Sequence, residues 1–250
     1  MTKLLLINPN TSAHVTQRML ETAQHCLGSL SQITGVTAQQ GPRIVGSRVE
    51  NVLAAQQALQ LGVEHAGGAD AIILAISTDA GLWALREALD IPVVGMLQAA
   101  ITTAAQWGQR IGLITLGAHM LPVYQEQARL YQLDGLLQAW AAPHLPQAFL
   151  PNAQTVEPVV LEKLQQQALQ MIALHDLDVL ILSGAVLSGY RAALQELLPV
   201  PVVDGIEAAA WQAWSMAQMQ AKKATVGSFA RIHQREASGV HPALIAHIAA

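Results

Sequence analysis

The chain repeats one order of elements at two places, and this internal repeat constrains its fold more than any other feature. Residues 70–100 read DAIILAISTDAGLWALREALDIPVVGMLQAA, and residues 178–209 read DVLILSGAVLSGYRAALQELLPVPVVDGIEAA. Each copy predicts a strand, a turn of small residues, a helix, a Pro-Val-Val strand and a helix that reaches Ala-Ala. Chance recurrence of these short runs in an α/β protein is the competing interpretation. The shared order and near-constant offset argue against it.

Short apolar runs alternate with longer helical segments along the rest of the chain, which is typical of parallel α/β sheets. We expect helices at Val49–His65 and Glu157–His175, among others. The strands that we expect are Lys3–Ile7, Ile33–Ala38, Ala71–Ile76, Val93–Gly95, Arg110–Thr115, Val179–Leu182, Val202–Val203 and Ala224–Gly227.

The repeat predicts two pseudo-symmetric α/β domains with parallel sheets and an interdomain cleft. The matching ends of the two copies place the chain crossings near Gly95–Gln98 and Asp204–Glu207. Domain one is then discontinuous, with residues 1–97 plus 207–250, and domain two is 98–206. A ligand is expected in the cleft, because open α/β sheets place their sites at the carboxyl ends of the strands.

Composition excludes several classes of protein. Hydrophobic residues make up 52% and charged residues 12%, a balance opposite to that of disordered chains. Lysine and arginine number 13 against 17 acidic residues, without a basic stripe, so no nucleic-acid partner is expected. The single cysteine, Cys26, rules out an internal disulfide or a multi-cysteine zinc site, and its helical spacing predicts a place on a buried face.

The hydropathy of the sequence bears on the location of the protein in the cell and on its oligomeric state. No run of 18 apolar residues occurs, and Leu4–Ile7 is too short for a signal peptide, so we expect a cytoplasmic protein without membrane contact. The mean hydropathy of +0.33 is high for such a protein. It indicates either alanine-rich helices at the surface or a homo-oligomer.

Three turns after predicted strands are expected to face the cleft. The first, Asn8-Pro9-Asn10-Thr11-Ser12, offers amides that suit a carbonyl or carboxylate near a helix start. It is also an ordinary turn in which Thr11 or Ser12 caps the next helix.

The second turn holds Ser77 and Thr78, two adjacent hydroxyls that would cradle an oxyanion if they are not simple helix caps. Asp79 is expected to be a cap or helix-dipole partner, not a base. The third turn, Ser183–Gly189, offers the backbone amides of Gly184 and Ala185, with Ser183 aimed away from them.

Other candidates are scarce. Of nine scattered histidines, His119 alone follows a strand at the cleft, and a surface position is the competing interpretation. Asn8 and Thr115 end two strands with related sequences and are expected to touch the ligand. Walker A, GxGxxG and GxSxG motifs are absent from the sequence, and no lysine is placed for a pyridoxal phosphate site, so no cofactor is expected.

Several motifs resemble the Asp/Glu/hydantoin racemase family, and most of all its hydantoin and allantoin racemases. They are INPNTS at 7–12, GP at 41–42, GADAIILA at 68–75, DAGL at 79–82, PVVGMLQAA at 92–100 and PVVDGIEAA at 201–209. The resemblance covers nearly the whole chain, most weakly over 120–170 and after about 228. It implies two α/β domains around a cleft and cofactor-independent chemistry at a carbon beside a carbonyl.

The resemblance also implies two cysteines, one from each half, that act as opposed acid and base. Here the first position holds Ile76 and the second holds Gly184, and Cys26 lies too far along a helix to replace either. Arylmalonate decarboxylases use one cysteine, at the position of Gly184, which this chain lacks as well.

Two classes of function therefore remain open. One is a racemase-like enzyme with altered chemistry, in which proton transfer falls to Ser77, His119, Tyr124 or water. Its ligand would be a small hydantoin, ureido or amino-acid-like carbonyl compound, held by Asn8, Asn10, Ser77, Thr78, Thr115, Gly184 and Ala185. The other is a non-catalytic paralogue that only binds such a ligand.

Overall fold

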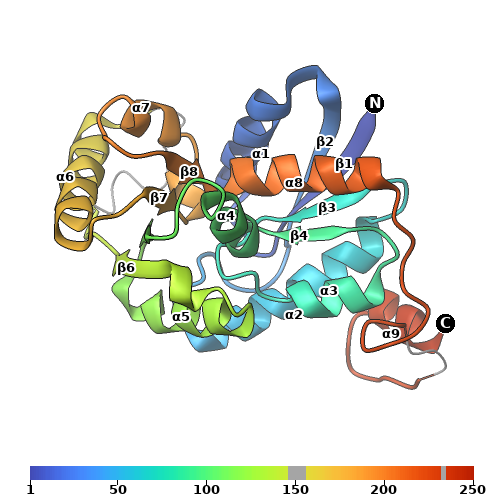
Figure 1. Ribbon diagram of the computed structural model, residues 1–250. Coiled ribbons are helices and arrows are strands. Elements are labelled where there is room, and N and C mark those ends of the chain that lie inside the picture. Colours follow the sequence, from blue (N-terminus) through green and yellow to red (C-terminus); the bar gives the residue numbers. More distant parts are fainter. Residues whose placement is uncertain (146–155, 232–234) are drawn as a thin grey trace.

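The structure is a computed structural model, and it describes residues 1–145, 156–231 and 235–250. Its described part holds two four-stranded parallel sheets, with strand orders β2-β1-β3-β4 and β6-β5-β7-β8. Because β1 corresponds to β5, and so on through β4 and β8, the two sheets have the same topology. The predicted α/β fold of two similar halves is confirmed (Figure 1).

The first sheet is built from the N-terminal part of the chain. Its strands are β1 Thr2–Asn8, β2 Ser31–Thr37, β3 Ala71–Leu74 and β4 Val93–Gly95. Its helices are α1 Ala13–Leu27, α2 Arg48–His65, α3 Leu82–Ala88 and α4 Met96–Ala104.

The second sheet repeats this order after α4. Its strands are β5 Ile111–Ile114, β6 Leu137–Ala141, β7 Val179–Leu182 and β8 Val202–Asp204. Its helices are α5 Leu121–Leu130, α6 Pro158–His175, α7 Arg191–Gln195 and α8 Gly205–Met219, and a last helix, α9 Pro242–Ala249, follows in the C-terminal segment.

Successive side chains of a strand point into different hydrophobic layers, because they alternate between the two faces of the sheet. Leu4 and Leu6 of β1 point to one layer, whereas Leu5 and Ile7 point to the other. The outer layer of the first sheet is closed by α2 and α3, and that of the second sheet by α6 and α7.

The remaining layer is shared by both sheets. It contains Leu6 and Ile73 of the first sheet, Leu113 and Ile181 of the second, and residues of α1, α4 and α8. Figure 1 shows α4 near the middle of the molecule and α8 running from there along the first sheet. The boundaries proposed at 97/98 and 206/207 fall in the first turns of α4 and α8, and they stay a prediction.

One expected strand was wrong, and one strand was not predicted. Ala224–Gly227 is irregular, not a strand, because Ala224 and the residues after it are exposed and join no described strand. Instead the edge strand β6 completes the second sheet at Leu137–Ala141, where buried Leu137, Ala139 and Ala141 alternate with less buried residues. Among the described residues, no helix is both long and apolar enough to cross a membrane.

The C-terminal segment returns to the first half and ends in α9, near α2 and α3 at the lower right of Figure 1. The Lys223 ammonium donates to the carbonyls of Glu87 and Leu89 at 2.6 and 2.8 Å, at the end of α3. A cation at this end of a helix interacts favourably with the helix dipole. Phe229 adds a ring contact to Trp83 of α3 at 5.7 Å.

Candidate active site

A cavity of about 300 Å³ lies where the carboxyl ends of β3, β5 and β7 meet the turns that follow them. Its lining comes from both halves of the molecule. The turn before α1, the loop 43–46 and residues 75–77 contribute from the first half, and residues 115–117, α5 and residues 184–186 contribute from the second. A site between pseudo-symmetric halves is the place that the repeat predicts.

The cavity brings together most of the residues proposed from the sequence. Asn10, Ser77 and Thr115 line it, as do Tyr124, Gly184 and Ala185. Asn8, Thr78 and His119 are not among its lining residues.

Ser77 and Tyr124 contact each other on the cavity wall. Their hydroxyls hydrogen-bond to each other at 2.6 Å, across the two halves. Burial raises the pKa of the Tyr124 phenol, and the neighbouring hydroxyls of Ser77 and Thr115 oppose the shift only in part. The phenol is therefore a proton donor at neutral pH, and Ser77 is its partner.

Thr115 has a hydroxyl without a partner. The side chain follows β5, is 0% exposed and lines the cavity. Its oxygen lies near the Tyr124 phenol but makes no hydrogen bond of standard geometry within the described part of the chain. The oxygen has almost no accessible surface, so it lies behind the Tyr124 phenol in the cavity wall and supports that side chain.

The turn after β1 is held by its own side chains. The Asn8 amide nitrogen donates to the Thr16 hydroxyl at 2.9 Å and to the Asn10 side-chain oxygen at 3.1 Å. The same Asn10 oxygen accepts from the Ser12 amide at 2.9 Å. Asn8 is fully buried and shapes the turn, whereas Asn10 reaches the cavity.

The expectation that Thr11 or Ser12 caps α1 was wrong. Ser12 holds the capping position, but its side chain accepts no amide of the helix. Its hydroxyl instead donates to the Arg43 carbonyl at 2.6 Å, and the Thr11 amide donates to the Pro42 carbonyl at 3.0 Å. These two bonds fasten the Gly-Pro loop to the first turn and place Arg43 at the cavity.

Arg43 and His14 are lining residues that the sequence reasoning missed. His14 lies in the first turn of α1, and burial and the Arg43 charge lower its pKa. The signal that was available is the Gly-Pro motif at 41–42, which precedes Arg43 directly. Nothing in the sequence alone joins that motif to the turn at Asn10.

Thr78 and Asp79 have structural partners. The Thr78 hydroxyl donates to the Asn51 side-chain oxygen of α2 at 2.6 Å. Neither Ser77 nor Thr78 starts α3, since its capping position is Gly81. The Asp79 carboxylate accepts the Leu97 and Gln98 amides at 2.9 Å each, so it caps α4 instead of its own helix.

The cap on α4 requires a glycine. A Cβ at Gly95 would lie 2.5 Å from the Asp79 carboxyl carbon. In the second half, the residue that corresponds to Gly95 is Asp204, and its own side chain caps α8 at the Ile206 and Glu207 amides. Burial raises the pKa of Asp79 to about 6, although the Leu97 and Gln98 amides and the Tyr131 hydroxyl oppose the shift.

His119 and Ser183 lie outside the cavity lining. His119 is exposed in the short helical turn Ala118–Met120. Ser183 is fully buried behind β7, with no hydrogen-bond partner in the described part of the chain.

The two positions where the resemblance implies cysteines both line the cavity. Ile76 presents an apolar side chain, and Gly184 presents none. Cys26 lies near the end of α1 on the face that packs against the shared layer, as predicted, and is half-buried there. Burial and the nearby Glu207 and Asp204 charges raise the pKa of its thiol to about 12, so it is no ready nucleophile.

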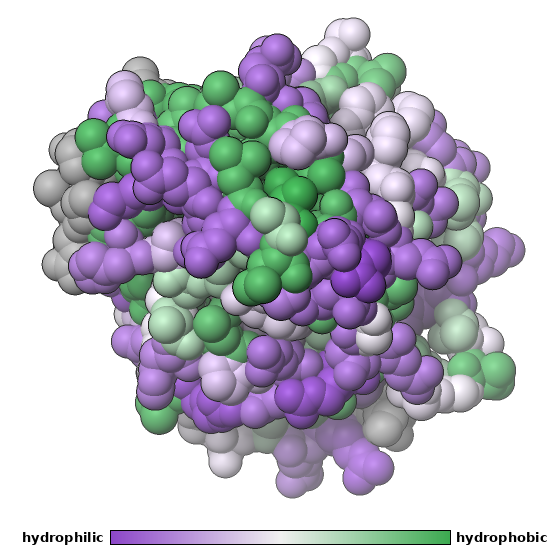
Figure 2. Space-filling model, turned by 60° about the vertical axis from the view of Figure 1, so that its left-hand side comes forward, coloured by the Kyte–Doolittle hydropathy of each residue, from purple (hydrophilic) through white to green (hydrophobic). Residues whose placement is uncertain are grey.

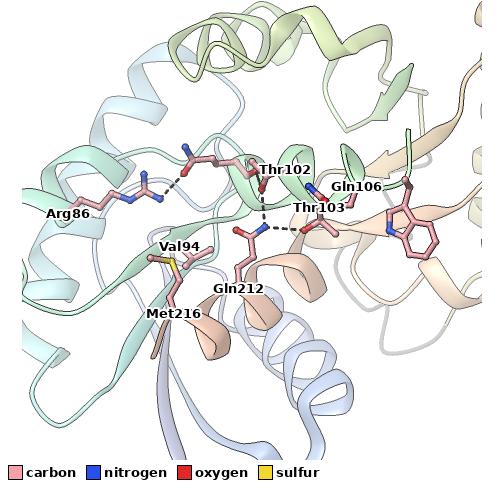
Figure 3. Close-up of a pocket in the computed structure, with 9 residues that line it drawn as sticks. Arg86, Val94, Thr102, Thr103, Gln106, Gln212 and Met216 are labelled. Carbon is pink, nitrogen blue, oxygen red and sulfur yellow. Dashed lines mark hydrogen bonds between the residues drawn. The ribbon is translucent and has the colours of Figure 1, made fainter. Parts of the chain in front are cut away.

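A second hollow of about 680 Å³ lies on the outside of α4 and α8 (Figure 3). Its polar side chains pair with one another. Arg86 donates to Gln98 at 2.7 Å, and Gln212 donates to Thr102 and Thr103 at 2.9 and 3.1 Å. Although larger, this hollow lies away from the strand ends, so the smaller cavity with its unpartnered groups is the candidate site.

Comparison with known proteins fits this arrangement of a cavity between similar halves. The Asp/Glu/hydantoin racemase family model matches residues 4–213, and the chain belongs to this family. A hydantoin racemase of Paenarthrobacter aurescens is 26% identical over 241 residues, which cover 94% of this chain and 99% of that protein.

Solved structures agree in fold. The allantoin racemase from Pseudomonas fluorescens has a TM-score of 0.88 at 25% identity, with 95% of this chain and 100% of that chain covered. The allantoin racemase from Klebsiella pneumoniae has the same TM-score at 23% identity, with 96% and 97% covered. The family and fold expected from the motifs are therefore confirmed.

Proposed function

We propose that the protein is a racemase-like enzyme that acts beside the carbonyl of a small hydantoin, ureido or amino-acid-like compound. The chemistry differs from that implied by the family's two cysteines, since Ile76 and Gly184 hold those positions. The observation that carries the proposal is the hydrogen-bonded pair of Ser77 and Tyr124 on the cavity wall.

The proposed chemistry needs a donor to the carbonyl oxygen and a route for the α-proton. The Ser77 hydroxyl and the amides at Gly184 and Ala185, all of them lining residues, supply the donors. When the C–H bond breaks, its electron pair moves into an enolate whose oxygen these donors stabilise. A water molecule in the cavity takes the α-proton and becomes a hydronium ion, and the neutral Tyr124 phenol gives its proton to the opposite face. The phenolate then regains a proton from the hydronium ion, which completes the inversion.

A second function is favoured by the raised pKa of Tyr124. A phenol that resists ionisation is a weak base, and no thiol lines the cavity. The alternative is a non-catalytic paralogue that binds the same class of ligand and leaves its α-proton in place.

Deuterium exchange separates the two. The protein is incubated in heavy water with 5-isobutylhydantoin, N-carbamoyl-leucine or leucine, and the α-proton is followed by NMR. An enzyme exchanges it, and Tyr124→Phe then slows exchange at least tenfold, in line with the usual size of acid–base contributions. Tyr190→Phe is the matched control, because Tyr190 is a buried tyrosine outside the cavity.

Binding without exchange would instead establish the paralogue. Exchange that survives Tyr124→Phe would reject the hydroxyl pair as the proton carrier. Exchange abolished by a thiol-alkylating reagent would mean that Cys26 takes part, against its place far along α1.

The proposal also includes the localisation, cofactor use and oligomeric state expected from the sequence. The protein is proposed to be cytoplasmic, to need no cofactor and to form a homo-oligomer. Exposed Trp107, Trp211 and Met216 near the α4–α8 hollow support association of copies, with Trp107 66% exposed. Figure 2 shows an apolar patch among hydrophilic residues on the face that it presents. Sedimentation velocity tests the oligomer, and a monomer at all concentrations would reject it.

A further inference from the structure

The charge of the cavity lining has one sign. Arg43, an exposed arginine, is its charged lining residue, and no aspartate or glutamate is among its described lining residues. His14 lies beside it, also exposed, and its lowered pKa leaves the ring neutral at pH 7 until an anion binds. The guanidinium of Arg43 has no hydrogen bond or ion pair within the described part of the chain, although its backbone carbonyl is bound by Ser12. A positive group without a counter-charge beside a cavity favours an anionic ligand.

The start of α1 adds to the positive electrostatic potential at the cavity. The helix has 15 residues, no acidic residue in its first turn and no side-chain cap at Ser12. The positive end of its dipole is therefore uncompensated, and His14 belongs to this turn. Asn10, whose oxygen is engaged by the Asn8 and Ser12 donors, keeps its amide nitrogen as a further donor beside it.

The rest of the lining is largely apolar. Its hydrophobic side chains include Val15, Ile44, Val45, Ile76, Met120 and Val186. A volume of about 300 Å³ holds roughly ten water-sized groups. The cavity thus fits a small molecule with one charged end and a compact apolar body.

We propose that the cavity takes a small monocarboxylate, whose carboxylate pairs with Arg43 and the His14–Asn10 turn while its aliphatic body lies against Ile76 and its neighbours. Arginine is suited to this role, because its planar fork binds carboxylates in a bidentate manner. The proposal rests on the proposed function in taking this cavity as the ligand site. It narrows the ligand from neutral rings such as hydantoins to their open acids.

Calorimetry with two matched probes tests the charge requirement. 4-Methylpentanoate and 4-methylpentanamide share one carbon skeleton and differ in charge. We expect the acid to bind at least about tenfold more tightly than the amide at pH 7. Arg43→Gln should remove this preference while leaving the affinity for the amide unchanged.

Arg48→Gln is the control variant. It removes the same charge five positions along, from an exposed arginine that pairs with Glu126 and does not line the cavity. We expect it to keep the preference for the acid. Circular dichroism establishes that each variant is folded before binding is compared.

Equal affinity of the wild-type protein for acid and amide overturns the proposal, and so does an absence of binding by either. A preference lost equally in Arg43→Gln and Arg48→Gln also overturns it, because net charge would then explain the result. The proposed function fails separately, when the acid binds as described but no substrate exchanges its α-proton in heavy water.

Discussion

Ser77 and Thr78 are adjacent hydroxyls with different surroundings. Ser77 faces the cavity and pairs with Tyr124, whereas Thr78 is buried and donates to Asn51 of α2. The first bond joins the two halves at the ligand site, and the second joins the turn to a helix behind it. Their substitutions should therefore differ in their effect on ligand binding.

Ser77→Ala should weaken binding of 4-methylpentanoate or N-carbamoyl-leucine about tenfold, and it should also lower the free energy of unfolding by about 1 kcal/mol because Tyr124 loses its partner. Thr78→Val should leave affinity unchanged and lower the free energy of unfolding by about 1 kcal/mol, because the Asn51 oxygen loses its donor. Calorimetry and urea denaturation measure the two effects. A stability loss confined to Ser77→Ala would contradict this division.

His14 should make binding depend on pH. Burial and Arg43 lower its pKa, so the ring is neutral in the free protein at pH 7. A bound carboxylate favours the protonated ring, so binding takes up a proton and strengthens as pH falls. Arg43 is the charged group that faces His14, and Tyr124, the other titratable lining residue, stays protonated over this range.

Between pH 8 and pH 6, we expect the affinity for 4-methylpentanoate to rise roughly threefold, and His14→Gln to flatten this slope. Calorimetry in two buffers of different ionisation enthalpy also counts the protons taken up. An unchanged slope in His14→Gln would assign the dependence to another group.

At the scale of elements, α4 and α8 start at corresponding places but obtain their caps differently. Asp79 reaches α4 from the turn after β3, whereas Asp204 caps α8 from its own position. The starts of the two helices also come close, since a Cβ on Gly205 would lie 2.9 Å from the Met96 side chain. Both helices border the layer that joins the halves, so their caps influence the whole interface.

Gly95→Ala should lower the free energy of unfolding by about 1–3 kcal/mol, the usual effect of forcing atoms into a packed site. The reason is the 2.5 Å approach of the new Cβ to the Asp79 carboxyl carbon. Gly28→Ala is a useful comparison, because no atom lies within 4 Å of its Cβ position and its cost comes from backbone conformation alone. Chemical denaturation of both variants measures the difference.

Sequence predicted the elements best where burial sets a clear pattern. Val93–Gly95 and Val179–Leu182 were predicted with their exact bounds, because short apolar runs there lie between turns or beside proline. The strand β6 was missed, because its sequence Leu-Gln-Ala-Trp-Ala contains no β-branched residue and its alternation of apolar and polar residues is weak. Ala224–Gly227 misled because apolar residues there are exposed.

The site was predicted only in part, for a physical reason. Ser77, Thr115 and Gly184 follow strands whose ends meet at one edge, so topology alone gathers them. Arg43 reaches the cavity through two hydrogen bonds between distant loops, to Thr11 and Ser12. Such contacts depend on tertiary packing, and no local periodicity reports them.

At the scale of the whole molecule, the two similar halves allow a test of whether the cavity still has the geometry of a two-cysteine racemase. Ile76 and Gly184 line the cavity from opposite halves. A Cβ at Gly184 would lie 3.6 Å from Leu187, an ordinary contact, so a side chain is accommodated there. The two positions can therefore receive thiols without rebuilding the fold.

The double substitution Ile76→Cys and Gly184→Cys should give α-proton exchange on leucine or N-carbamoyl-leucine at least about tenfold above the parent chain, since two thiols supply an acid and a base on opposite faces. Deuterium uptake followed by NMR measures it, and the single variants are the controls. A folded double variant without exchange would show that the cavity positions its ligand differently from a two-thiol racemase.

The helices α4 and α8 are capped from different positions, and this difference restricts the order in which substitutions can change one half into the arrangement of the other. Asp79 caps α4 and needs Gly95 beside it, whereas in the second copy of the repeat Leu187 stands at the position of Asp79, and Asp204 caps α8 itself. An aspartate introduced at 95 first would meet the Asp79 carboxylate, while loss of Asp79 first leaves the helix start bare but still packed. The order of substitution is therefore constrained: the distant carboxylate must leave before the local one arrives. This dependence of one mutation on another is a form of epistasis that pairwise comparison of the two repeats would miss.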